Sequence, residues 1–140
     1  MKSVLSLLLL LNFFTNIASA QLPKIRTGKH LLTLQWIGAE KPGMVLIENK
    51  GKGMYSIKGE QRNAAGEYLT VEGSIQVIGP KEIRFEGLIE SKVAHINGGQ
   101  PCRRTGIQVF KATGTRKYWR LQKMINCEGG MVTDYIDIYF

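Results

Sequence analysis

The two cysteines have the best-defined chemistry in this sequence. Cys102 and Cys127 lie far apart, whereas a redox dithiol has two residues between its cysteines. A zinc site needs four ligands, and the only histidines, His30 and His95, have no closely spaced partner. An even cysteine count in an exported chain indicates a disulfide. The sequence therefore predicts a Cys102–Cys127 bridge and no metal site, with a redox pair and a Cys2His2 site as the alternatives.

The segment RKYWRLQKM, residues 116–124, mixes four basic residues with Tyr118 and Trp119. Basic and aromatic side chains together can hold an anionic head group, an acidic glycan or nucleic acid. In a strand, alternation would put Trp119 and Leu121 on the packed face and Tyr118 and Arg120 on the outer face. A binding surface and an ordinary strand therefore both remain open interpretations of this segment.

Six residues are the candidates for a ligand site. They are aromatic or cationic and fall on or beside predicted strands: Trp36, Tyr118, Trp119, Arg120, Arg103 and Arg104. The two neighbouring arginines follow Cys102, so we expect the disulfide to hold them at one rim of the fold, beside the strand that carries Trp119.

Enzyme motifs are missing from this sequence. It contains no G-x-S-x-G elbow, no H-E-x-x-H and no P-loop. Asp134 and Asp137 are three positions apart, so a regular strand sends them to opposite faces and does not pair them for acid–base chemistry. We predict no catalytic residue and no cofactor, and an enzyme assembled from scattered residues is the alternative.

The N-terminus predicts export. Residues 1–20 contain Lys2, an apolar run from Val4 to Phe14, and the small-residue site Ala18-Ser19-Ala20. This is the layout of a secretory signal peptide, and the apolar run is short for a transmembrane helix. We expect a signal peptide over 1–20 and one domain over 21–140, in the periplasm or secreted. An uncleaved anchor is the alternative.

The charge of the chain is strongly positive and uneven along the sequence. The formal net charge is +8, and loss of Lys2 with the signal peptide leaves +7. Eight basic residues and no acidic residue lie between Glu90 and Glu128. This asymmetry indicates an anionic partner or, alternatively, a solvated basic face. Nucleic acid is disfavoured as a partner because the chain is expected to be exported and carries no nucleic-acid-binding motif.

The elements that must position these residues are strands. Apolar and polar residues alternate, as Ile83, Phe85 and Ile89 do against Arg84 and Glu86, and glycine-containing turns separate the segments. The expected strands are 30–37, 43–49, 53–61, 67–78, 82–96, 106–112, 116–124 and 133–140. Short connections favour an all-β antiparallel meander that closes into a small barrel, with a two-sheet sandwich as the alternative.

This pattern of about eight meandering strands resembles the lipocalin and avidin-type, calycin-like barrels. Those families often place a Trp on the first strand after a glycine and lay an Arg or Lys over it. Trp36, in LLTLQWIG, lacks the preceding glycine, and Arg120 is the candidate for the basic partner. The tail, from RKYWRLQKM onward, is similar to short secreted bacterial β proteins, which implies export and a β fold but no mechanism.

The last nine residues, VTDYIDIYF, resemble the final strand of bacterial outer-membrane barrels, apart from Asp134. The expected strands are mostly shorter than a membrane-spanning strand requires. Taken together, the sequence predicts an exported, non-catalytic barrel that binds a small amphiphilic or anionic ligand or an envelope partner. An integral outer-membrane barrel and an enzyme are the alternatives.

Overall fold

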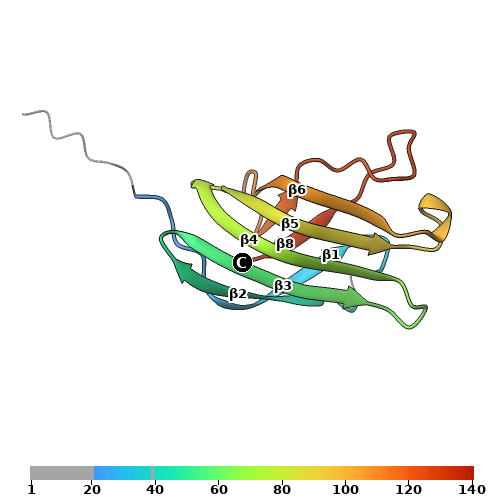
Figure 1. Ribbon diagram of the computed structural model, residues 1–140, viewed down its shortest axis with the longest axis horizontal. Coiled ribbons are helices and arrows are strands. Elements are labelled where there is room, and N and C mark those ends of the chain that lie inside the picture. The colour runs from blue at the N-terminus through green and yellow to red at the C-terminus, as the bar shows by residue number, and fades with distance from the viewer. Residues whose placement is uncertain (1–20, 39) are drawn as a thin grey trace, which may run out of the picture.

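The fold is a closed antiparallel barrel of eight strands (Figure 1). The computed structural model describes residues 21–38 and 40–140, and the expected signal peptide lies outside them. Each strand pairs with the next, and β8 closes on β1 through Leu32↔Ile138. The elements are β1 Gly28–Leu34, β2 Gly43–Gly51, β3 Met54–Arg62, β4 Tyr68–Gly79, β5 Glu82–Lys92, the short 3-10 helix η1 Asn97–Gly99, β6 Cys102–Lys111, β7 Tyr118–Leu121 and β8 Ile136–Tyr139. The predicted closed meander is confirmed.

Side chains fill the barrel interior. Aliphatic residues from every strand except β6 pack around Phe85 and Phe110, whose rings meet edge to face at 6.2 Å between centroids. The outer face carries ion pairs such as Lys58–Glu72 and Arg84–Glu86. A membrane-spanning barrel has an apolar outer face and a polar interior, whereas the interior of this barrel is mainly apolar. Within the described ranges, none of the helical structure is long and apolar enough to span a membrane.

A row of three glycines bends the sheet. Gly73, Gly87 and Gly106 lie opposite one another on β4, β5 and β6. A Cβ on Gly73 would collide with the carbonyl oxygen of Glu86 and would lie 2.9 Å from the ring of Phe85. Only glycine permits this close approach of neighbouring strands. The row therefore provides the sharp curvature that a barrel of this size requires.

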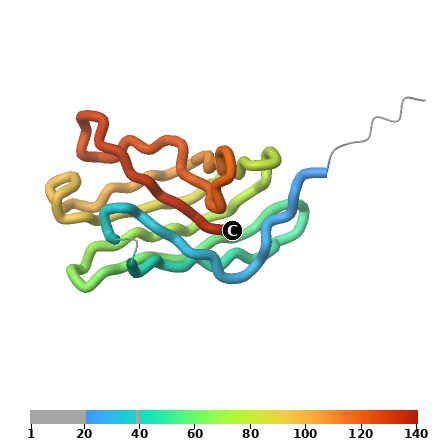
Figure 2. Tube along the Cα trace, turned by 180° about the vertical axis from the view of Figure 1, so that it is seen from behind, coloured from blue at the N-terminus to red at the C-terminus, as the bar shows by residue number. Residues whose placement is uncertain are grey.

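The barrel has two distinct ends (Figures 1 and 2). We define the open end as the chain before β1, the β2–β3 and β4–β5 turns, the β6–β7 loop and the residue after β8. It lies at the left in Figure 1, where the blue N-terminal segment joins the barrel. The closed end consists of the other four connections, which include η1 and the long β7–β8 loop. Meander topology fixes this division because successive connections alternate between the two ends.

The Cys102–Cys127 disulfide is present at the closed end, as predicted. The predicted strand boundaries around it were wrong. β5 ends at Lys92 because the chain turns at Asn97, Gly98 and Gly99, all with positive φ. β6 begins at Cys102, not at residue 106, so the cysteine lies within a strand. The expected strand 116–124 is shortened to Tyr118–Leu121.

Candidate ligand-binding site

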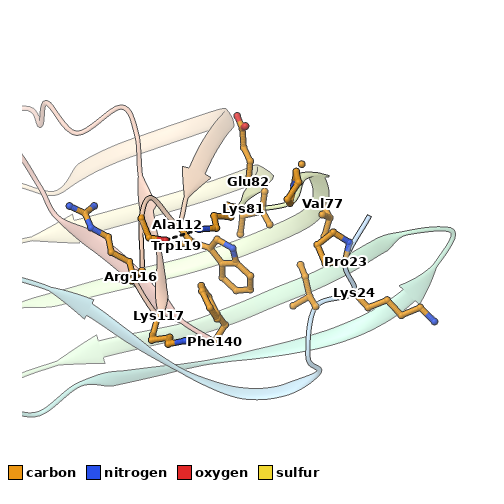
Figure 3. A pocket seen from close by; sticks show the side chains of 16 residues that line it. Pro23, Lys24, Val77, Lys81, Glu82, Ala112, Arg116, Lys117, Trp119 and Phe140 are labelled. Carbon is orange, nitrogen blue, oxygen red and sulfur yellow. Dashed lines mark hydrogen bonds between the residues drawn. The ribbon is translucent and has the colours of Figure 1, made fainter. Parts of the chain in front are cut away.

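A cavity of about 510 Å³ lies in the open end of the barrel (Figure 3). Trp119 of β7 and Phe140, just after β8, form its centre, with 4.6 Å between ring centroids. The buried side chains of Ile25 and Ile83, and Val77 at the end of β4, complete the apolar wall. Trp119 points inward because it alternates with Tyr118 and Arg120 along β7. The result is a concave apolar surface of the size that small ligands use.

Cationic side chains surround this apolar wall. Lys24, Lys81, Arg116 and Lys117 line the cavity, and none of them belongs to an ion pair among the described residues. The Lys81 ammonium donates a hydrogen bond to the Gly114 carbonyl at 2.6 Å, which fixes the β6–β7 loop over the cavity. An apolar floor beneath a positive rim suits a ligand with an apolar body and an anionic head.

The segment before β1 crosses the barrel mouth. The Ile25 amide donates a hydrogen bond to the Tyr55 hydroxyl at 3.3 Å. The buried His30 ring lies between two carbonyl oxygens, with Nε2 at 2.6 Å from Arg26 and Nδ1 at 2.7 Å from Tyr139. A second cavity of about 590 Å³ lies on the other side of the segment and shares Pro23, Lys24 and Val77 with the first. The segment therefore divides the open end into two adjacent cavities.

Two of the six candidate residues lie on the outer face beside the cavity. Arg120 donates two hydrogen bonds of 2.7 Å to the carboxylate of Asp137, and this bidentate contact raises the pKa of Arg120. The rings of Tyr118 and Tyr135 lie 5.2 and 4.3 Å from its guanidinium carbon. Tyr118 and Arg120 thus form an outer-surface cluster, as strand alternation predicted, and only Trp119 of this strand enters the cavity.

The other three candidates lie at the closed end, away from Trp119. Arg104 points inward and pairs with Asp134 at 2.9 Å. Both side chains are at most 8% exposed to solvent. Trp36 Nε1 donates to the same carboxylate at 2.9 Å. Arg103 is exposed and pairs with Glu90 at 2.9 Å. These residues do not join the ligand site.

Arg103 and Arg104 lie at one rim beside the disulfide and on the strand next to β7, as expected, but they lie at the opposite end of the barrel from Trp119 for a topological reason. β6 and β7 are antiparallel, so the start of β6 lies at the closed end and the start of β7 at the open end. The suggested Arg120–Trp36 contact was wrong. Arg104 approaches Trp36 instead, through the shared Asp134 carboxylate.

Several cavity residues were missed in the sequence. Ile25, Val77, Lys81 and Phe140 come from three separate places in the chain. The meander topology could have predicted them. It brings the segment before β1, the β4–β5 turn and the end of β8 to the same end of the barrel as the start of β7, which carries Trp119. No metal-ligand cluster of three or more His, Cys, Asp or Glu residues occurs in the part of the chain that the structure describes.

The comparison with known proteins identifies the family. Residues 15–140 match the PM1083 family. The chain belongs to the PM1083 family. A relative is found in Pasteurella multocida (strain Pm70), where it is named Uncharacterized protein PM1083. The two sequences are 43% identical over 114 residues, which are 81% of this chain and 72% of the relative. No solved structure matches, so the resemblance of this PM1083-family barrel to lipocalins and avidins stays a prediction.

Proposed function

We propose that this PM1083-family protein is an exported, non-catalytic binding protein for a small amphiphilic anion. One observation carries the proposal: the open-end cavity combines the Trp119–Phe140 aromatic floor with a rim of four unpaired cations. The apolar part of the ligand would lie against Trp119, Phe140 and Ile25. Its anionic head would lie among the rim cations.

The chemistry of the cavity favours binding over catalysis. Glu82 is the acidic residue in the lining, and it pairs with Lys111 at 3.6 Å. The cavity lining holds no Asp, His, Cys or Ser, and Glu82, Thr115 and the rim lysines are its groups that acid–base or nucleophilic chemistry could use. The mainly apolar lining supports binding as the proposed role.

Export is part of the proposal. The expected signal peptide supports it, as does the disulfide, because such bridges persist in oxidising compartments. N-terminal sequencing of the protein isolated from its native cells should begin at Gln21. An N-terminus at Met1 in the cell-envelope fraction would reject cleavage.

The binding test uses the fluorescence of Trp119. Trp36→Phe leaves Trp119 as the only tryptophan, so titration of this variant with laurate below its micellar concentration should shift and saturate the emission. Dodecyltrimethylammonium, with an equally long chain and a cationic head, should bind far more weakly.

The matched variant for this titration is Trp119→Leu. This change removes the aromatic floor and leaves Trp36 as a reporter at the closed end, so the emission should not respond to laurate. Isothermal calorimetry should show laurate affinity reduced by at least ~10-fold, because a well-packed aromatic contact contributes on the order of 1.5 kcal/mol or more. Equal binding of both detergents, or unchanged affinity in Trp119→Leu, would reject the proposed site.

A further inference from the structure

The net charge of the domain is concentrated at one end of the barrel. The open end, taken as residues 21–29, 48–53, 78–82 and 111–117 together with Phe140, holds nine bases and two acids. The bases are Lys24, Arg26, Lys29, Lys50, Lys52, Lys81, Lys111, Arg116 and Lys117, and the acids are Glu48 and Glu82.

The rest of the barrel is electrically balanced. The closed end holds six bases and six acids, and the middle of the strands holds three of each. The entire excess of positive charge that remains without Lys2 therefore lies at the open end. The basic stretch between Glu90 and Glu128 contributes three of the nine open-end bases, Lys111, Arg116 and Lys117. Its three other arginines, Arg103, Arg104 and Arg120, lie elsewhere on the barrel and are each paired with an acid.

Most of the open-end cations are unpaired. Lys50 pairs with Glu48 and Lys111 with Glu82. The remaining seven cations form no ion pair with any described residue. Like charges gathered at one end repel one another, so a protein that maintains this arrangement gains from an anionic partner at that end.

Exposed apolar side chains accompany these cations. Leu22, Ile78 and Phe140 are each between 43 and 45% exposed at the open end. On the adjoining outer face, Leu31 and Met44 are opposite each other on β1 and β2 and line a shallow depression. Unpaired cations interspersed with exposed apolar side chains are the pattern of proteins that bind at a membrane interface.

We propose that the open end docks onto the surface of an anionic lipid bilayer. The seven unpaired cations contact the head groups, and Leu22, Ile78 and Phe140 enter the interface between head groups and acyl chains. This orientation places the mouth of the Trp119 cavity against the bilayer. A nucleic-acid or polysaccharide partner would use the cations but would gain little from Leu22 and Ile78, which is why we favour a lipid surface.

Sedimentation with vesicles tests this proposal. The purified protein should bind phosphatidylcholine vesicles that contain phosphatidylglycerol, should not bind vesicles of phosphatidylcholine alone, and should be released by salt. Replacing Lys24, Lys52 and Lys117 with serine should lower the affinity roughly 100-fold, because each cation near an anionic surface contributes about a factor of five.

The matched control removes the same charge from the closed end. Lys41, Lys92 and Lys123 are also exposed and unpaired within the described chain. Their replacement with serine should change vesicle affinity less than ~5-fold, since charges beyond a Debye length of the surface are screened. An equal loss in both triple variants would overturn the proposed orientation, and absence of binding to phosphatidylglycerol vesicles would overturn docking itself.

A second pair of variants separates a lipid surface from other polyanions. Leu22→Ser with Ile78→Ser should weaken vesicle binding by at least ~10-fold, whereas Ile107→Ser with Ile125→Ser, at positions 57 and 54% exposed elsewhere on the barrel, should not. Unchanged vesicle binding in the first double variant would show a general polyanion site and overturn the lipid assignment. Near-UV circular dichroism of all variants checks that the fold is retained.

This inference goes beyond the proposed function and can fail separately from it. Trp119→Leu leaves every open-end cation in place, so it should dock on vesicles as the unaltered protein does. If the unaltered protein docks on vesicles but does not bind laurate, the proposed cavity ligand is rejected and the docking surface stands. If it binds laurate but does not dock on vesicles, the docking surface is rejected and the cavity ligand stands.

Discussion

Two arginine–aspartate pairs show what the alternation of side chains predicts about single residues, although Asp134 lies two residues before β8. Asp134 and Asp137 were expected on opposite faces, and the structure confirms it: Asp134 pairs with Arg104 inside the barrel and Asp137 with Arg120 outside. Alternation gives the face of each carboxylate. It cannot give the partner, because Arg104 lies 30 positions from Asp134 and meets it only through the closed barrel.

The Asp134 carboxylate should be the most sensitive polar group for stability. It accepts hydrogen bonds from Arg104, Trp36 and Asn126. Asp134→Ala leaves the buried guanidinium uncompensated and should lower the free energy of unfolding by about 3–5 kcal/mol in urea titrations. Glu72→Ala breaks the Lys58 pair, in which both side chains are more than 60% exposed, and should cost about 1 kcal/mol or less. Similar losses in both variants would contradict this assignment.

The Glu67 carboxylate should make stability depend on pH. The Ala94 amide donates to it at 2.8 Å and the Asn63 amide at 2.9 Å, and these bonds lower the pKa of Glu67 below its ordinary value of 4.5. A lowered folded-state pKa adds stability above the unfolded-state pKa, and this contribution is lost as the pH falls through the folded-state pKa.

Urea titrations at several pH values should resolve the Glu67 contribution. The difference in unfolding free energy between the unaltered protein and Glu67→Gln should be largest near neutral pH and should shrink below pH 4.5, the ordinary value. Glu40→Gln, at an exposed position in the β1–β2 connection, serves as the control. A difference that grows on acidification would contradict the role given to Glu67.

At the scale of the element, the strands were predictable and their junctions were not. The periodicity of two located all eight strands and their order, because inward positions such as Phe85 and Ile89 are apolar. It failed around residues 93–105, where β5 ends in a turn of positive-φ residues and β6 begins at Cys102. That error placed Arg103 and Arg104 in a loop, whereas they are among the first residues of β6, at that same end of the barrel. Cross-strand register decides such junctions, and a single sequence does not contain it.

The glycine row offers an element-scale test of curvature. Gly73→Val places a side chain against the Glu86 carbonyl of the neighbouring strand and should destabilise the protein by about 2 kcal/mol or more in thermal or urea unfolding. Ser74→Val, at the next and outward-facing position of β4, should change stability by less than about 0.5 kcal/mol. A Gly73→Val protein as stable as Ser74→Val would show that the close strand approach is dispensable.

At the scale of the whole molecule, the cavity and the charge polarity emerge only from closure. The residues that meet around Trp119 come from the segment before β1, the β4–β5 turn, the β6–β7 loop and Phe140. Sequence order suggested that the basic region lies between Glu90 and Glu128, whereas the barrel distributes those bases over both ends. Once the meander is known, assigning each connection to an end recovers both features. The proposed ligand and the proposed docking surface both rest on the composition of the open end.

The pairing of β1 with β8 has a further consequence, for the order of folding. Every other strand pair joins neighbours in the sequence, so seven of the eight ladders can form as soon as adjacent hairpins exist. The eighth joins Leu32 to Ile138 and waits for the last residues of the chain. Until then β1 presents an unpaired edge to other nascent chains. The pairing of the four-residue β8 with β1 therefore covers the last free edges of the sheet.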